Sequence, residues 1–193
     1  MSEPARRSAT LPKIRLVPAS RRYETAFLDA ARRSRELHRP WSSAPTTPAG
    51  FRRYLKSCGR GSDAGYFILS PAGELTGVVN VSEVVRGPFR SAYLGYYAFA
   101  PHQGRGYMTA GLAAVVSAAF REMKLHRLEA NIQPGNTASI ALVKRLGFRK
   151  EGYSERYLKI GGRWRDHERW AVTVERWKRP SRAAARPATR RAR

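Results

Sequence analysis

The order of apolar and polar positions along the chain predicts alternating strands and helices. Apolar and polar residues alternate over residues 78–85, as in a strand with one buried face. Residues 107–123 instead carry apolar side chains three or four positions apart, which predicts a helix that packs on a core. The same patterns predict further strands at 14–17, 65–70, 91–100, 127–132, 149–160 and 163–177, and further helices at 20–37, 47–56 and 136–146.

Capping and turn residues divide these segments. Ser20, Thr47 and Asn136 are suitable N-caps, and Pro48 suits a first helical position. Gly161-Gly162 predicts a hairpin turn between the last two strands. The resulting order is a strand, two helices, three antiparallel strands, a helix, a strand, a helix and a long hairpin. This order predicts an α+β fold with a mixed, mostly antiparallel central sheet flanked by helices.

The chain divides into one folded domain and two polar ends. A length of 193 residues suits a single domain with a full core. Residues 1–12 are polar and contain prolines, so we expect a flexible N-terminal arm before a domain over residues 13–177. Residues 178–193 carry Lys and Arg, no acid and nothing apolar larger than alanine. This composition predicts a disordered basic tail.

The charge of the chain restricts its partners. There are 37 Lys and Arg against 14 Asp and Glu, a formal net charge of +23. The basic surface and tail favour association with RNA or the ribosome, and they disfavour polycationic substrates. The single cysteine, Cys58, excludes an internal disulfide framework and predicts a cytoplasmic protein. We expect no membrane span, because no apolar stretch approaches the roughly 20 residues that one needs.

One glycine-rich segment carries the clearest chemical signal. An apolar run ends at Pro101, a turn with Gly104 and Gly106 follows, and a helix then begins. The glycines allow a ligand to approach the backbone, and the first N–H groups of a helix attract anions. Arg105 adds a positive charge, so the turn is a candidate phosphate site, although a plain strand-to-helix turn gives the same pattern. The signatures of nucleotide P-loops and dinucleotide folds are absent.

The segment Gln103–Met108 resembles the acetyl-CoA signature [QR]-x-x-G-x-[GA] of the GNAT N-acetyltransferases, with Met108 in place of the final small residue. Asn136-x-x-Ser139 and the following Leu146-Gly147-Phe148-Arg149 resemble the second signature of that family. Residues 163–167, Arg-Trp-Arg-Asp-His, resemble its ribosomal-protein-alanine N-acetyltransferase branch. The resemblance covers residues 14–177. It implies a GNAT fold that transfers acetyl from acetyl-CoA to an amine, without a metal and without a covalent enzyme intermediate.

The resemblance also implies which residues bind the coenzyme. The glycine turn would hold the pyrophosphate through backbone N–H groups, and the end of the preceding strand would offer its backbone to pantetheine and to the thioester carbonyl. Asn136 would bond the pantetheine arm, unless it only caps its helix. The expected coenzyme-binding residues are Tyr97, Ala98, Phe99, Gln103, Gly104, Arg105, Gly106, Tyr107, Met108 and Asn136.

The proton-transfer residues are less clear. Many members of the family carry a tyrosine four residues before the Gly-Phe pair, but here that position is Val143. The resemblance to the ribosomal-protein branch instead implies Ser139 as the acid that protonates the leaving thiolate, with a purely structural serine as the alternative. Glu83 is the best carboxylate candidate for a base, or else a solvent-facing strand residue. His102 and His167 are further candidates to relay protons, and a structural role is the alternative for both.

The lack of a strong candidate for a general base affects which acceptor amine we expect. A terminal α-amine titrates near ~7.7–8.0 and a lysine amine near ~10.4, so the terminal amine needs less help to become neutral. We therefore expect transfer to a protein N-terminal α-amine, that of a ribosomal protein. Two alternatives stay open: an acetyltransferase of small amines, and a basic RNA- or ribosome-binding module with weak or no catalysis. The exposed-looking Trp41 either covers the sheet or walls a substrate groove.

Overall fold

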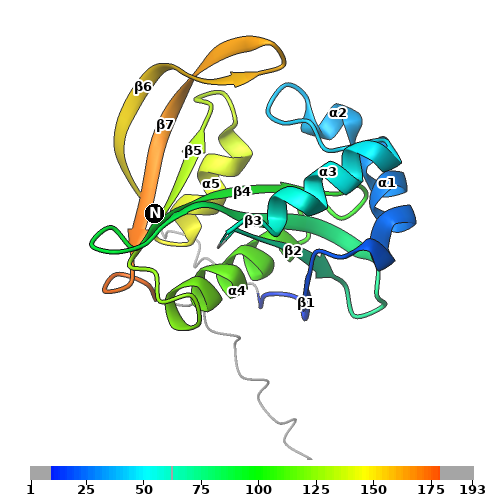
Figure 1. The fold of residues 1–193 in the computed structure, drawn as a ribbon, viewed down its shortest axis with the longest axis horizontal. Coiled ribbons are helices and arrows are strands. Elements are labelled where there is room, and N and C mark those ends of the chain that lie inside the picture. Colours follow the sequence, from blue (N-terminus) through cyan, green and yellow to red (C-terminus); the bar gives the residue numbers. More distant parts are fainter. Residues whose placement is uncertain (1–9, 62, 179–193) are drawn as a thin grey trace, which may run out of the picture.

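The computed structural model describes residues 10–61 and 63–178. These residues form a seven-stranded sheet with the strand order β1-β2-β3-β4-β5-β7-β6 (Figure 1). Among the described strands only β4 and β5 pair in parallel, so the predicted α+β fold with a mixed, mostly antiparallel sheet is confirmed. The elements are β1 (Arg15–Pro18), η1 (Arg21–Tyr23), α1 (Glu24–Arg33), α2 (Arg35–His38), α3 (Pro48–Cys58), β2 (Ala64–Leu69), β3 (Leu75–Val85), β4 (Ser91–Ala98), α4 (Tyr107–Arg121), β5 (Arg127–Ile132), α5 (Thr137–Arg145), β6 (Arg149–Ile160) and β7 (Arg163–Thr173).

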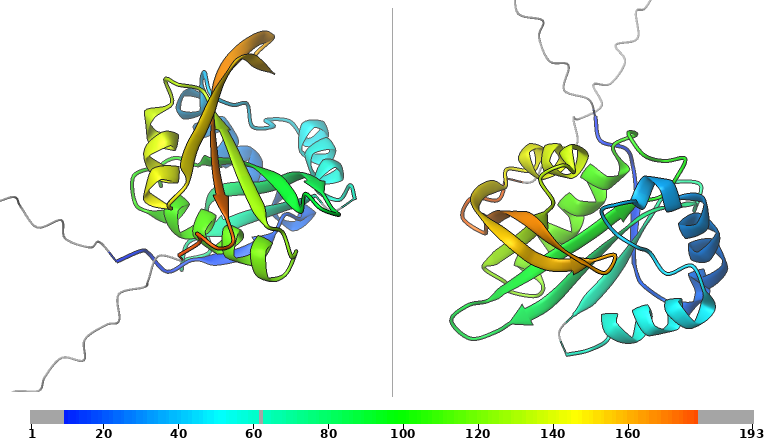
Figure 2. Two further views of the ribbon diagram at one scale, coloured as in Figure 1. Left: turned by 90° about the vertical axis from the view of Figure 1, so that its left-hand side faces the viewer. Right: turned by 90° about the horizontal axis from the view of Figure 1, so that it is seen from above.

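Helices cover both faces of the sheet (Figure 2). On one face, α4 and α5 pack on strand residues such as Val79, Val81 and Leu94. On the other face, α1 and α3 pack on the alternate strand residues, including Val78. Successive side chains of a strand point to opposite faces, so each central strand contributes to both cores. The β6–β7 hairpin extends beyond these layers (Figure 1).

The predicted helix over residues 20–37 is interrupted. It divides into η1, α1 and α2, and Ser20 makes no side-chain cap. The division between α1 and α2 falls at Ser34, which is fully buried. Its Oγ donates to the Ala30 carbonyl at 2.7 Å and accepts from the Ala100 N–H at 2.9 Å. This tertiary bond ties the helical segment to the chain just beyond β4, and no local pattern reveals it.

Other local predictions are confirmed. Thr47 caps α3 by accepting the Gly50 N–H at 3.1 Å, with Pro48 in the first turn. Gly161 and Gly162 both have positive φ in the turn between β6 and β7. These features depend only on residues close in sequence, which is why the sequence suffices to predict them.

The centre of the sheet is split. β4 and β5 pair only from Ser91↔Arg127 to Tyr93↔Glu129. Beyond this point, residues 94–98 stay paired with β3, while residues 130–132 stay paired with β7. The two strands therefore diverge, and a gap opens between their carboxyl ends.

The expected ends of the domain are only partly described. Residues 1–9 of the expected flexible arm lie outside the described residues, as do residues 179–193 of the expected tail. Residues 10–12 are described, and they line the cavity presented below. Across residues 10–61 and 63–178, no helix has both the length and the apolar character of a membrane span.

Candidate active site

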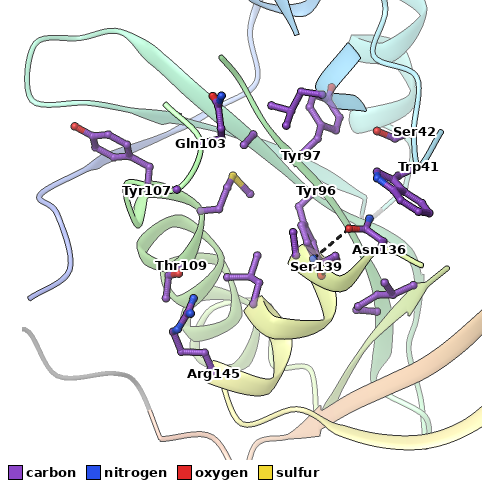
Figure 3. A pocket seen from close by; sticks show the side chains of 18 of the residues that line it. Trp41, Ser42, Tyr96, Tyr97, Gln103, Tyr107, Thr109, Asn136, Ser139 and Arg145 are labelled. Atoms are coloured by element: carbon purple, nitrogen blue, oxygen red, sulfur yellow. Dashed lines mark hydrogen bonds between the residues drawn. The ribbon is translucent and has the colours of Figure 1, made fainter. Parts of the chain in front are cut away.

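A cavity of about 1320 Å³ lies at the split in the sheet (Figure 3). Strand residues 94–98 and 130–132 face it from the two diverging strands. The turn before α4 and the start of α5 close one side, and the segment around α2 closes another. Besides these strand residues and Leu37, it is lined by Thr10, Leu11, Pro12, His38, Trp41, Ser42, His102, Gln103, Gly104, Arg105, Gly106, Tyr107, Met108, Thr109, Gln133, Asn136, Ala138, Ser139, Leu142, Arg145 and His167.

The glycine turn needs both of its glycines. Gly104 has φ 76° and Gly106 has φ 81°, in the left-handed region that L side chains rarely adopt. A Cβ on Gly106 would also come within 3.1 Å of Cδ of Pro12. The described end of the N-terminal segment is therefore packed against the turn, which shapes the cavity from a side that the sequence motif does not include.

The first turn of α4 is open to a ligand. Gly106 is its N-cap, so no side chain caps the helix, and the first turn contains no acid. The first N–H groups of a helix have no partner inside the helix, and they lie at the positive end of its dipole. The exposed Arg105 stands beside them. All six residues of the predicted segment, Gln103–Met108, line the cavity, so the arrangement suits a phosphate group.

Met108, the departure from the family signature, is accommodated by another glycine. Its sulfur lies where a Cβ on Gly77 of β3 would stand. Met108 also packs on the core beneath α4. The large side chain is therefore directed toward the sheet, and the turn keeps its open backbone.

The backbone groups at the end of β4 differ from the expectation for Tyr97, Ala98 and Phe99. The Phe99 N–H donates to Thr76 and its carbonyl accepts from His102, both at 2.9 Å, and its side chain is fully buried. Nε2 of His38 donates to the Ala98 carbonyl at 2.8 Å. Phe99 therefore has no main-chain group left for a coenzyme, and Ala98 keeps only its N–H.

The pairing of β4 shows which peptide groups face the gap. The Phe99 N–H points to β3, and in an antiparallel ladder every second residue does the same. Tyr97, which pairs with Val78, therefore directs its peptide groups to β3. Those of Tyr96, which lies beyond the last residue paired with β5, are directed into the gap. The peptide groups that face the gap are therefore those of Tyr96 and not, as expected, those of Tyr97.

Tyr96 also contacts the predicted acid. Its hydroxyl and the Ser139 hydroxyl form a hydrogen bond of 2.7 Å, in which either oxygen can donate. Burial raises the pKa of Tyr96 well above its ordinary value of 10, so its hydroxyl stays protonated at neutral pH. Val143, at the usual tyrosine position, is fully buried in the core. The phenol near the start of α5 thus comes from β4, 43 residues away in sequence.

Asn136 caps α5, as its position before the helix predicts. Its side-chain oxygen accepts the Ser139 N–H at 3.2 Å. The cap uses only the carbonyl oxygen of the Asn136 amide, so the amide nitrogen remains available as a donor. Since Asn136 lines the cavity, this nitrogen can bond a ligand there. The two roles considered for Asn136 are thus compatible.

Glu83 is not brought to this site. It lies in a bulge of β3 near the turn to β4, with φ 52°, and its side chain is exposed. The cavity lies at the opposite end of the β3–β4 pair, and Glu83 does not line it. The choice of Glu83 as a base is therefore corrected. A position in a strand does not reveal at which end of the sheet the site will form.

Both candidate histidines line the cavity. His102 lies in the turn after β4, with its ring edge-on to Tyr107, and its buried Nδ1 has no hydrogen-bond partner among the described residues. His167 is 1% exposed, and its Nδ1 bonds the Arg165 carbonyl at 2.9 Å. Burial lowers the pKa of His167 below its ordinary value.

Several cavity residues were missed from the sequence. Thr109 and Arg145 approach the cavity from α4 and α5 (Figure 3), and Tyr96 approaches from β4. The sequence does not distinguish Thr109 and Tyr96 from other residues of an amphipathic helix or strand, and the pattern around Arg145 predicts only a surface residue. Trp41 had been noted as exposed-looking, and it also borders a second cavity of about 260 Å³ with Trp164, among other residues. Within the described residues, no three His, Cys, Asp or Glu side chains gather as metal ligands.

Comparison with known proteins relates this geometry to one family. Residues 13–149 match the acetyltransferase (GNAT) domain family. The [ribosomal protein uS5]-alanine N-acetyltransferase of Escherichia coli is 46% identical over 104 residues, which are 54% of this chain and 54% of that protein. The matched part thus spans about half the length of that relative.

Solved structures share the fold over most of the chain. RimJ of Mycobacterium smegmatis, in complex with CoA-disulfide, has a TM-score of 0.78 and 30% identity, and the match covers 85% of this chain and 83% of that one. Spermidine N-acetyltransferase of Vibrio cholerae, in complex with CoA and spermine, has a TM-score of 0.71 at 18% identity, over 84% of this chain and 96% of that one. The second likeness concerns the fold alone.

Proposed function

Since this chain belongs to the GNAT acetyltransferase domain family, we propose that it transfers acetyl from acetyl-CoA to the N-terminal α-amine of a ribosomal protein. The observation that carries the proposal is the uncapped start of α4 beside the split between β4 and β5. An anion site and a row of backbone groups lie next to each other there, as a long coenzyme with a pyrophosphate requires. We propose residues 13–177 as the catalytic domain.

The described residues fit the coenzyme. The N–H groups at the start of α4 would hold the pyrophosphate, with Gly104 and Gly106 permitting close approach. The peptide groups of Tyr96 would bond the pantetheine arm, and the Asn136 amide nitrogen would add a donor. Arg145 supplies a cation to the same cavity. When bound, acetyl-CoA supplies the thioester whose acetyl carbon the acceptor amine attacks.

Ser139 would donate a proton to the sulfur that leaves. Its hydroxyl lines the cavity and is held at 2.7 Å by the Tyr96 hydroxyl. Because burial keeps Tyr96 protonated, this phenol can donate to Ser139 as Ser139 gives its own proton away. A main-chain N–H facing the gap, such as that of Ala98 or Tyr96, would polarise the thioester carbonyl.

The acceptor would approach between Trp41 and the β6–β7 hairpin. The second cavity lies there and shares Trp41 and Gln133 with the first. Its other residues include Trp164, Arg165 and Asp166. An acceptor peptide would therefore meet aromatic side chains, one positive charge and one negative charge. The similarity to a protein named for alanine N-acetylation supports a protein N-terminus as the acceptor.

A panel of acceptors tests the proposal. The full chain is incubated with acetyl-CoA and with three acceptors: a peptide with a free N-terminal alanine, the same peptide blocked at its N-terminus but containing lysine, and spermidine. We expect acetylation of the free N-terminus at the highest kcat/KM. Preference for spermidine would establish the small-amine alternative. Binding of coenzyme without transfer to any acceptor would contradict the catalytic proposal.

Association with the ribosome is a separate part of the proposal, supported by the net charge of +23. If residues 178–193 act as a tether, a protein that ends at Trp177 keeps its turnover on a short peptide and loses affinity for RNA. Affinity that depends on phosphate contacts falls by about 0.7 log units per contact for each log unit of salt on single strands. Equal RNA affinity and equal salt dependence in both proteins would assign any binding to the folded domain.

A further inference from the structure

His167 stands in the cavity with one ring nitrogen committed to the backbone. Its Nδ1 lies 2.9 Å from the carbonyl oxygen of Arg165. A carbonyl can only accept, so Nδ1 carries the proton and Nε2 carries the lone pair. None of the described residues forms a hydrogen bond with Nε2, although the side chain is only 1% exposed and lines the cavity. Nε2 is thus the nitrogen left to a ligand.

His167 approaches the split from the face opposite Ser139. On β7, Trp170 pairs with Ala130, and both belong to the core beneath α4 and α5. Residues an odd number of positions apart on a strand point to opposite faces, so His167 points away from that core. Ser139 lies on α5, on the other side of the sheet. The cavity reaches both residues because β4 and β5 diverge between the two faces.

We infer that His167 is the general base that deprotonates the acceptor amine, an inference that rests on the proposed acetyltransferase function. Nε2 takes one proton from the acceptor ammonium, and the neutral amine forms a C–N bond to the acetyl carbon. The C–S bond breaks, and Ser139 protonates the sulfur. The nitrogen loses a second proton, which replaces the one that Ser139 gave. The products are the amide, the CoA thiol and one proton, which His167 releases to solvent.

The surroundings keep this imidazole neutral. Burial lowers its pKa below the ordinary 6.5, while the bond to Arg165 and the charge of Asp166 act in the opposite direction. Among the described residues, the ring of Tyr157 on β6 also packs against it, with ring centroids 6.0 Å apart. Because the pKa is lowered, the lone pair on Nε2 remains present as pH falls toward 6.5. A base of this kind suits an α-amine of pKa ~7.7–8.0, which is mostly protonated at neutral pH.

The pH dependence of His167→Gln tests this role. Near pH 6.5 an α-amine of pKa ~7.7–8.0 is only about 3–6% neutral, so we expect kcat/KM on an N-terminal peptide to fall about 15- to 30-fold. The deficit should shrink as pH rises past the pKa of the amine, because the acceptor then arrives neutral. His126→Gln is the matched control, because His126 is exposed, pairs with Glu175 and does not line the cavity. Coenzyme affinity, measured by calorimetry, should be unchanged in both variants.

A second measurement needs neither catalysis nor a variant. Long-range ¹⁵N–¹H NMR spectra of the unliganded protein should show His167 protonated at Nδ1 and titrating below 6.5. A proton on Nε2 at neutral pH, or a loss in His167→Gln that is the same at every pH, would overturn the inference and leave the proposed function intact. A wild-type protein that acetylates no acceptor would overturn the proposed function and, with it, the inference.

Discussion

The two helices that begin at the cavity, α4 and α5, are built in opposite ways at their first turns. α4 starts at Gly106 with φ 81° and no side-chain cap, so its first N–H groups are left to a ligand. α5 starts at Asn136, whose side chain accepts the Ser139 N–H. Ser139 in turn bonds Tyr96 of β4. An open helix start suits anion binding, whereas a capped and tethered start fixes one hydroxyl in place.

The difference suggests a division of labour that substitutions can test. Changes at the α4 start should alter coenzyme affinity, and changes at the α5 start should alter the rate of the chemical step or the stability of the protein. The following substitutions are ordered from the largest expected effect to the smallest.

Ser139→Ala removes the proposed proton donor. General acid catalysis is typically worth ~10²–10⁴ in rate, so kcat should fall by at least a factor of about 100. The coenzyme Kd should stay the same. Thr137→Ala is the control, because Thr137 lies in the same helical turn, is exposed and does not line the cavity. A loss of less than about threefold in Ser139→Ala would assign Ser139 to helix structure alone.

Gly106→Glu closes the open start of α4. Glutamate at this position must adopt φ 81°, which L residues rarely do, and its Cβ would come within 3.1 Å of Cδ of Pro12. Its carboxylate also places a negative charge at the proposed anion site. We expect coenzyme affinity to fall by about a factor of 100, which corresponds to about 2.7 kcal/mol. Gly73→Glu is the control, because Gly73 has φ 86° in an open turn away from the cavity. Calorimetry measures coenzyme affinity in both folded variants. If Gly106→Glu binds the coenzyme as tightly as Gly73→Glu does, the pyrophosphate does not bind at this turn.

Tyr96→Phe removes the tether of Ser139 and keeps the ring. A hydrogen bond contributes about 0.5–1.5 kcal/mol net, so kcat should fall about two- to tenfold with little change in the coenzyme Kd. Because the raised pKa keeps Tyr96 protonated, the ratio of wild-type to variant kcat should stay constant from pH 6 to pH 9. A ratio that changes across this range would contradict a neutral phenol.

Asn136→Ala should have the smallest effect, mainly on stability. Loss of an N-cap costs about 1 kcal/mol, which lowers Tm by about 2–4 °C in a protein of this size. Asn136→Ser keeps a capping oxygen and removes the amide nitrogen. If Asn136 also bonds the coenzyme, the serine variant will unfold at nearly the wild-type temperature and bind coenzyme more weakly. Wild-type affinity in that variant would leave Asn136 as a cap only.

Much of the site was predictable where the signal is local. The residues of Gln103–Met108 are consecutive, so the turn, the helix start and the charge of Arg105 all appear in one segment. Asn136 and Ser139 are three residues apart, so the cap and its partner also share one segment. Strand ends were less predictable: Phe99 has both backbone groups used by Thr76 and His102, and only the pairing shows this.

The sequence by itself determined the order of strands and helices, the glycine turn and the caps of α3 and α5, because these depend on neighbours within a few residues. Tertiary structure decided the rest. It brought Tyr96 to Ser139, directed His167 into the cavity, packed Pro12 against the turn and left Glu83 at the far end of the sheet. The physical reason is the split between β4 and β5. Where two strands diverge, and what therefore lies across the gap, depends on pairing between segments far apart in the chain.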